Sequence, residues 1–174
     1  MPTLRHAFDR RTALRLTAST LLAPVLPARA LVRPADTIVL TVHGRVRIVN
    51  DAGAAQFDMA MLQQLPQASY DTRTPWFSQP RRFTGPLLRD VLSAAGAQGS
   101  TLRMVALNDY RVDMPWEDPQ RHDVILARLL DGKPMAVRDK GPLLVMYPFD
   151  AHAELRNATH YSRAIWQLRA IEVL

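Results

Sequence analysis

The chain has 174 residues, of which 48% are hydrophobic and 22% are charged. This length allows one domain with short appendages, and the composition can supply a buried core, which excludes a disordered or repeat protein. The chain contains no cysteine, so disulfides, thiolate nucleophiles and cysteine-ligated metal sites are excluded.

The formal net charge of +6 is concentrated at the N-terminus. Residues 1–30 hold five arginines and a single acid, so residues 31–174 carry a net charge of only +2. A domain this close to neutrality lacks the basic footprint of a nucleic-acid-binding protein. We therefore expect no nucleic-acid partner.

The first thirty residues have the pattern of an export signal. Arg10 and Arg11 precede a modestly apolar segment, residues 13–26, and an A-x-A cleavage pattern follows at residues 28–30. Paired arginines predict a twin-arginine-like signal, although Asp9 stands where Ser or Thr is usual, so an ordinary secretory signal is the alternative. The segment is too short and too interrupted to span a bilayer. Both alternatives predict a periplasmic mature chain, residues 31–174, without a membrane span.

The first elements expected in the mature chain are a hairpin and a short helix. Alternating apolar residues predict strands at 38–42 and 46–48, joined by a tight turn at His43-Gly44. Asp58 is expected to cap a helix over residues 59–65, which Pro66 would end.

A strand and the clearest helix follow. Residues 70–76 predict a strand that runs into a proline-broken loop, where we interpret Trp76 as a packing anchor. A helix is expected to begin near Pro86, with Leu88 and Leu92 on its buried face, and to stop at Gly96.

The rest of the chain is predicted to be mainly strands. These are residues 102–107, 111–114, 124–130, 143–147 and 165–173. Asp131-Gly132 between two apolar runs is a strong hairpin signal. The sequence thus predicts a single α/β domain, residues 31–174, that is β-rich, with mixed sheets and few helices.

Common catalytic signatures are absent, because the sequence contains no nucleophile elbow, P-loop, dinucleotide fingerprint or zincin motif. Arg138 and Lys140 beside Gly141 can hold an anion, since a glycine turn exposes backbone N–H groups and the cations neutralise charge. A solvated hairpin loop is the alternative.

His152, Glu154 and His160 form a second group with metal-ligand chemistry. Imidazole and carboxylate groups can hold Zn²⁺, but this spacing matches no standard site. We therefore favour solvated loop residues over a zinc-dependent hydrolase and assign no metal ligand from the sequence.

Four motifs follow one another along the chain: F-T-G-P-L-L-R-D-V-L at 83–92, A-L-N-D-Y at 106–110, D-G-K-P-M at 131–135 and K-G-P-L at 140–143. In this order they resemble the molybdopterin-binding domain of sulfite-oxidase-type oxidoreductases, over about residues 37–174. Trp166 and Gln167 before the last apolar run also fit. The resemblance implies that fold and a molybdopterin cofactor. The cofactor-binding residues that it implies are Arg138, Lys140, Gly141, Thr72, Arg73 and Asn108.

The resemblance also implies a cysteine ligand to molybdenum, and this chain departs from it there. The corresponding position is near Thr72, a few residues before Trp76. A threonine hydroxyl is hard and stays protonated at neutral pH, so it cannot replace an anionic thiolate. The usual cysteine-ligated molybdenum is therefore not expected, while a pterin phosphate needs no thiolate.

Two hypotheses of different classes follow, and the sequence leaves open whether the chain is an enzyme. The first is an exported oxidoreductase-family protein that binds molybdopterin without ligating molybdenum in the usual way. The second is a periplasmic module that keeps the fold without cofactor or catalysis and binds a small anion or a protein partner.

Overall fold

The structure is a computed structural model that describes residues 31–174; the predicted export signal lies outside the described residues. The described strands are β1 (Ile38–Gly44), β2 (Ala55–Asp58), β3 (Gln67–Thr72), β4 (Arg81–Pro86), β5 (Thr101–Ala106), β6 (Arg111–Pro115), β7 (Ile125–Ala127), β8 (Leu129–Leu130), β9 (Lys133–Pro134), β10 (Leu144–Met146) and β11 (Leu168–Val173). The described helices are α1 (Met59–Gln64), α2 (Leu88–Ala94), α3 (Asp118–Arg121) and α4 (Ala158–Arg163), with 3₁₀ turns η1 (Val137–Asp139) and η2 (Ala153–Leu155).

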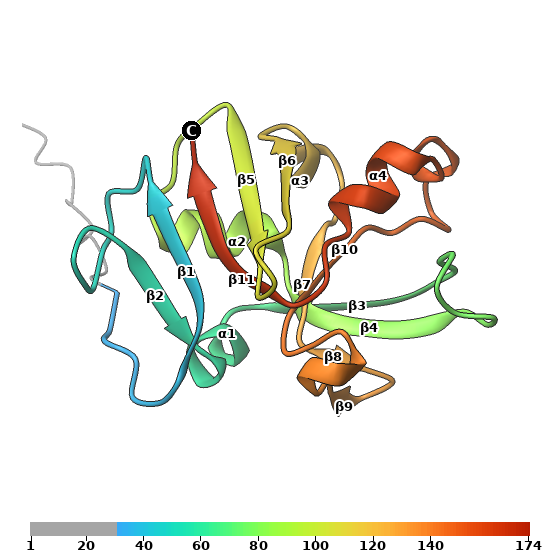
Figure 1. The fold of residues 1–174 in the computed structure, drawn as a ribbon, viewed down its shortest axis with the longest axis horizontal. Coiled ribbons are helices and arrows are strands. Elements are labelled where there is room, and N and C mark those ends of the chain that lie inside the picture. Colours follow the sequence, from blue (N-terminus) through green and yellow to red (C-terminus); the bar gives the residue numbers. More distant parts are fainter. Residues whose placement is uncertain (1–30) are drawn as a thin grey trace, which may run out of the picture.

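The largest sheet has five strands in the order β2-β1-β11-β5-β6 (Figure 1). The C-terminal strand β11 lies at its centre, parallel to β1 and antiparallel to β5. Val42 pairs with Ile171, and Leu102 pairs with Val173. The sheet is therefore mixed, and the strand predicted near the end of the chain is confirmed.

The hairpin predicted at His43-Gly44 is wrong. Both residues belong to β1, residues 46–48 form no strand, and the antiparallel partner of β1 is β2. Gly44 has φ +86° and packs against the backbone of Val173, where an added Cβ would overlap the Val173 carbonyl. A glycine is needed at this position because β1 and β11 approach closely here, and not because the chain turns. A local sequence pattern does not report such a contact between distant segments.

A second sheet has the order β3-β4-β8-β9, and β7 pairs with β10 in a separate ribbon. The hairpin at Asp131-Gly132 is confirmed, because Leu130 pairs with Lys133 across it. Asp131 and Gly132 have φ +48° and +75°, the positive values that a tight hairpin turn requires. The strand predicted at 124–130 is divided into β7 and β8, and β3 ends at Thr72, before the predicted limit of residue 76.

The short helix α1 has the predicted cap. Asp58 Oδ1 accepts a hydrogen bond from the Met61 N–H at 2.8 Å, and Oδ2 accepts from Ala35 at 2.8 Å and Asp36 at 3.3 Å. The N–H of Met61 lacks a partner within the helix, so the side chain supplies one. Asp58 also fixes the segment that leads into β1.

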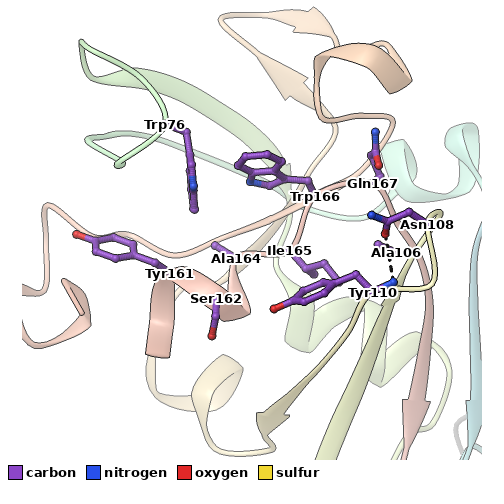
Figure 2. Close-up of a pocket in the computed structure, with 10 residues that line it drawn as sticks. All are labelled: Trp76, Ala106, Asn108, Tyr110, Tyr161, Ser162, Ala164, Ile165, Trp166 and Gln167. Atoms are coloured by element: carbon purple, nitrogen blue, oxygen red, sulfur yellow. Dashed lines mark hydrogen bonds between the residues drawn. The ribbon is translucent and has the colours of Figure 1, made fainter. Parts of the chain in front are cut away.

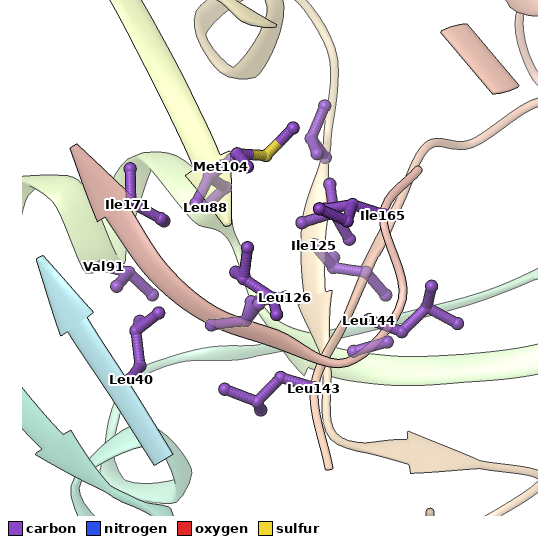
Figure 3. Packing of buried hydrophobic residues seen from close by; sticks show 14 of the residues in the cluster. Leu40, Leu88, Val91, Met104, Ile125, Leu126, Leu143, Leu144, Ile165 and Ile171 are labelled. Carbon is purple, nitrogen blue, oxygen red and sulfur yellow. The ribbon is translucent and has the colours of Figure 1, made fainter. Parts of the chain in front are cut away.

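The predicted face of α2 is buried, although the helix begins at Leu88 because Pro86 belongs to β4. Leu88 and Val91 lie beside Leu40 and Ile171 of the main sheet (Figure 3). This packing joins helix and sheet in one core with β7 and β10. No helix within residues 31–174 is long and apolar enough to cross a membrane.

Candidate functional site

An aromatic cleft of about 290 Å³ opens at the end of the main sheet (Figure 2). It is lined by Trp76, Ala106, Asn108, Tyr110, Tyr161, Ser162, Ala164, Ile165, Trp166 and Gln167. These residues come from the β3–β4 connection, the β5–β6 turn, α4 and the segment that enters β11. The cleft therefore forms only when segments distant in sequence are folded together.

Three half-buried rings dominate the cleft. The ring of Trp76 lies 5.3 Å from that of Trp166, edge to face at 85°, and 6.2 Å from that of Tyr161 at 79°. Edge-to-face pairs of this kind are favourable and leave ring faces available to a further planar group. None of the described lining residues carries a charge; the polar groups are amides and hydroxyls. This surface suits a planar heterocycle.

Gln167 holds three segments together at the floor of the cleft. Its φ is +54°, its N–H donates to the Lys140 carbonyl at 3.1 Å, and its Nε2 donates to the Val137 carbonyl at 2.7 Å. Its own carbonyl accepts from the Leu107 N–H at 2.9 Å. The β5–β6 turn and the η1 loop are thus fixed relative to the start of β11.

Lys140 supplies a positive charge at the edge of the cleft. Lys140 follows the last residue of η1 and has a left-handed backbone with φ +74°. Its ammonium nitrogen lies 4.4 Å from the centre of the Trp166 ring and 5.2 Å from that of the Phe77 ring. Both distances allow a cation–π interaction. Gly141 follows, and an added Cβ there would overlap the Met135 carbonyl, so a larger residue would displace this loop.

Asn108 is the one residue of the sequence-predicted set that lines the cleft directly. Its Oδ1 accepts a hydrogen bond from the Tyr110 N–H at 3.2 Å (Figure 2), which leaves its Nδ2 for a ligand or water. Asp109 between them forms an ion pair with Arg169, and this contact anchors the turn to β11.

The other predicted residues lie in different environments. Thr72 is 1% exposed, and its Oγ1 accepts a hydrogen bond from the Asp150 N–H at 3.1 Å. The Arg73 N–H donates to Asp150 Oδ2 at 3.1 Å while its side chain is 74% exposed. Arg138 is 88% exposed, 3.6 Å from Asp139. The structure thus places Asn108 in the lining of the cleft and Lys140 at its edge, over the Trp166 ring. The other four predicted residues lie outside the lining: Thr72, Arg73, Arg138 and Gly141.

The residues present do not fit a cysteine-ligated molybdenum centre. Thr72, near the position that the resemblance gives to the metal ligand, is closed to solvent, and its hydroxyl is engaged with the backbone of Asp150. No thiolate is available anywhere in the chain. The aromatic cleft with Lys140 at its edge fits an aromatic ring system bearing an anionic group, which requires no metal ligand.

A separate cluster joins His122, His152 and Glu154, whose ligand atoms all lie within 4.8 Å of one another. The sequence pattern had paired His152 and Glu154 with His160 instead. His160 lies outside this group, and its Nδ1 is 3.1 Å from Asn157 Oδ1. Burial lowers the pKa of His160, against the opposing charge of Asp118.

Sequence reasoning missed most of the cleft. Trp76 was interpreted as a packing anchor, whereas it forms one wall and also packs against the core. Tyr161 carried no signal of its own, and Trp166 was noted only through the resemblance. His122 was missed because it lies thirty residues before His152 and shares no motif with it.

No protein-family model and no curated protein matches the chain. A solved structure is similar: the sulfane dehydrogenase SoxCD from Paracoccus pantotrophus, with a TM-score of 0.57 and 16% sequence identity. The match covers 77% of this chain and 37% of that one, so this protein spans well under half the length of its structural neighbour. The likeness confirms the predicted sulfite-oxidase-type fold, and at this identity it shows the fold alone.

Proposed function

We propose that this protein is a binding module with a sulfite-oxidase-type fold that holds a small planar anionic molecule in the aromatic cleft. The first candidate is a pterin that carries a phosphate. The observation that carries the proposal is the arrangement of Trp76, Tyr161 and Trp166 around one cavity, with the ammonium group of Lys140 over the Trp166 ring.

Each part of the cleft has a role in this proposal. The ring faces contact the planar part of the ligand, and the amides of Asn108 and Gln167 give direction through hydrogen bonds. Lys140 attracts the anionic group, and its ammonium lies 4.4 Å from the centre of the Trp166 ring. Thr72 takes no part, because its hydroxyl is buried and bonded.

An oxidoreductase that uses molybdopterin is the competing hypothesis, supported by the fold that this chain shares with a sulfane dehydrogenase. The binding module is favoured because the closed environment of Thr72 and the cysteine-free sequence provide no ligand for the metal. Export to the periplasm is a further part of the proposal and rests on the pattern of residues 1–30.

The decisive experiment combines metal analysis with ligand titration. Protein isolated from its own periplasm should contain no molybdenum, whereas one molybdenum per chain would favour the oxidoreductase hypothesis instead. Purified protein is then titrated by calorimetry with a phosphate-bearing pterin, the same pterin without phosphate, and inorganic phosphate. We expect the phosphorylated pterin to bind most tightly. If none of the three ligands binds, the proposal is overturned.

Tryptophan fluorescence locates the binding. The chain has three tryptophans, and Trp116 lies outside the cleft. A Trp116→Phe variant leaves only the two cleft tryptophans as reporters, so its emission should change on binding as strongly as that of wild type. Binding with unchanged emission would assign the ligand to another surface.

A further inference from the structure

His122, His152 and Glu154 converge from two segments at the surface. His122 follows the last residue of α3, while His152 and Glu154 belong to the start of η2. Their ligand atoms lie within 4.8 Å of one another, and His152 Nδ1 is 3.2 Å from Glu154 Oε1. The rings of His122 and His152 are 5.0 Å apart, edge to face.

His122 carries an independent sign of a missing partner. Its Nδ1 is buried, and within residues 31–174 it has no hydrogen-bond partner; the one other side-chain atom in this condition is Thr74 Oγ1. A buried polar atom without a partner is costly, so such atoms in native proteins usually have a bound water or ion. The unsatisfied atom belongs to the residue that anchors the cluster to α3.

We propose that His122, His152 and Glu154 form a binding site for a divalent transition metal of the Zn²⁺ class. Two imidazoles and one carboxylate are a typical ligand set for Zn²⁺. Mg²⁺ and Ca²⁺ fit the site less well, because they bind oxygen ligands in preference to imidazole nitrogen. Three protein ligands leave a fourth tetrahedral position for water. This site is independent of the aromatic cleft and of the ligand proposed for it.

The local structure allows the three groups to close on an ion. Bonds of about 2.1 Å at tetrahedral angles place ligand atoms about 3.4 Å apart, so the cluster must contract slightly. The side chains of His152 and Glu154 are 40% and 64% exposed, which leaves them free to move toward His122. The backbone of His122 is held, because its N–H donates to the Asp118 carbonyl at 3.0 Å and its carbonyl accepts from Val124 at 2.8 Å.

An ion bound here would cross-link the end of α3 to η2. The loop that contains η2 leads directly into α4, which contributes Tyr161 to the cleft. Metal binding is therefore expected to stabilise the folded protein, since an ion that binds only the folded state shifts the unfolding equilibrium by mass action.

The test uses the full chain, expressed without a polyhistidine tag and freed of metal with a chelator that is then removed. Zn²⁺ affinity is measured by competition with a chromophoric chelator, and melting temperature is measured with and without Zn²⁺. Wild type should bind one Zn²⁺ per chain and melt at a higher temperature when it is loaded. His122→Ala and His152→Ala should each lose more affinity than the about tenfold to hundredfold typical of residues that only support a ligand.

His160→Ala is the matched control, because His160 is a neighbouring histidine outside the cluster. It should keep both the affinity and the thermal shift of wild type. His152→Ala alters a partly exposed side chain, so it reports on the site even if His122→Ala fails to fold. Absence of Zn²⁺ binding by wild type, or equal binding by wild type and His152→Ala, would overturn the proposal.

Discussion

The ammonium group of Lys140 lies 4.4 Å from the centre of the Trp166 ring. The carbonyl of Lys140 accepts a hydrogen bond from the N–H of Gln167, the residue that follows Trp166. The two contacts fix the cation relative to the ring from both the side chain and the backbone. Such preorganisation reduces the entropy lost when an anion binds. The cleft therefore presents its aromatic surface and the Lys140 ammonium group in a set geometry.

Lys140→Met should weaken binding of a phosphate-bearing pterin by about one to two powers of ten. A charge-assisted hydrogen bond contributes roughly 1.5–3 kcal/mol, and each 1.4 kcal/mol is tenfold in affinity. Methionine keeps an apolar chain over Trp166 and removes the charge. Calorimetric titration of the variant measures the loss, and binding of the unphosphorylated pterin should change little.

Arg138→Met is the matched control. Arg138 is 88% exposed, and its nearest charged partner is Asp139 at 3.6 Å, so we expect a smaller effect on binding than from Lys140→Met. Equal losses from both substitutions would show that the anion lies over the whole η1 loop, as the sequence pattern alone suggested. A larger loss from Arg138→Met would move the binding site away from the cleft.

Asp58 should make folding stability depend on pH in the acid range. Its hydrogen bond from Met61, followed by those from Ala35 and Asp36, holds the pKa of this carboxyl below its ordinary value despite burial. The stabilising contribution is complete above the unfolded pKa of about 3.9 and is lost as pH falls through the lower folded pKa. Urea unfolding of wild type between pH 5 and pH 2 should show this decline.

Two substitutions separate the cap from the charge of Asp58. Asp58→Asn keeps an acceptor for Met61 but not for Ala35 and Asp36, so it should lose part of the stability at pH 7 and flatten the acid decline. Asp58→Ala should also lose the cap, typically about 1 kcal/mol. If the stability of Asp58→Asn falls with acid as steeply as that of wild type, the pH dependence comes from other carboxylates.

Leu92→Ala should lower the free energy of unfolding by about 2–5 kcal/mol, because it leaves a cavity where α2 packs on the main sheet. Leu92 is 1% exposed. The adjacent Ser93 is exposed, so Ser93→Ala should change stability by less than about 0.5 kcal/mol. Chemical denaturation of both variants tests whether the buried face of α2 is correctly placed.

Export can be tested on the arginine pair. Arg10→Lys with Arg11→Lys keeps the charge of the N-terminal segment but removes the feature that predicts the twin-arginine route. We expect the double variant to remain in the cytoplasm, as judged by cell fractionation and by retention of the uncleaved chain. Normal export of the variant would assign the ordinary secretory route.

Local signals in the sequence predicted the local structure well. The Asp58 cap, the Asp131-Gly132 turn and the buried face of α2 depend on residues a few positions apart, and each is confirmed. The turn at His43-Gly44 was wrong because Gly44 serves a contact with β11, 129 residues later. Parallel pairing of the first and last strands leaves no local pattern.

The candidate site was predictable only in part for the same reason. Asn108 and Lys140 belong to turns with recognisable composition, so a pattern could select them. The walls of the cleft come from Trp76, Tyr161 and Trp166, and nothing in the sequence relates the first of these to the other two. The approach of His122 to His152 likewise follows from tertiary packing.

Thr72→Cys tests whether this position can provide a metal ligand. The substitution supplies the residue type that the resemblance implies, and it introduces the sole thiol of the chain. Because Thr72 is 1% exposed, the thiol should react slowly with iodoacetamide in the native protein and rapidly in urea. Burial also disfavours the thiolate, which further slows alkylation.

The surroundings of Thr72 predict a cost and a negative result with metal. Its hydroxyl accepts the Asp150 N–H, and sulfur is a weaker acceptor, so Thr72→Cys should lose about 1 kcal/mol of stability. Protein expressed with the molybdenum cofactor available should still contain no molybdenum. Rapid alkylation of the native variant, together with stoichiometric molybdenum, would show that one substitution separates this protein from a working metal centre. That result would favour the oxidoreductase hypothesis over the binding module.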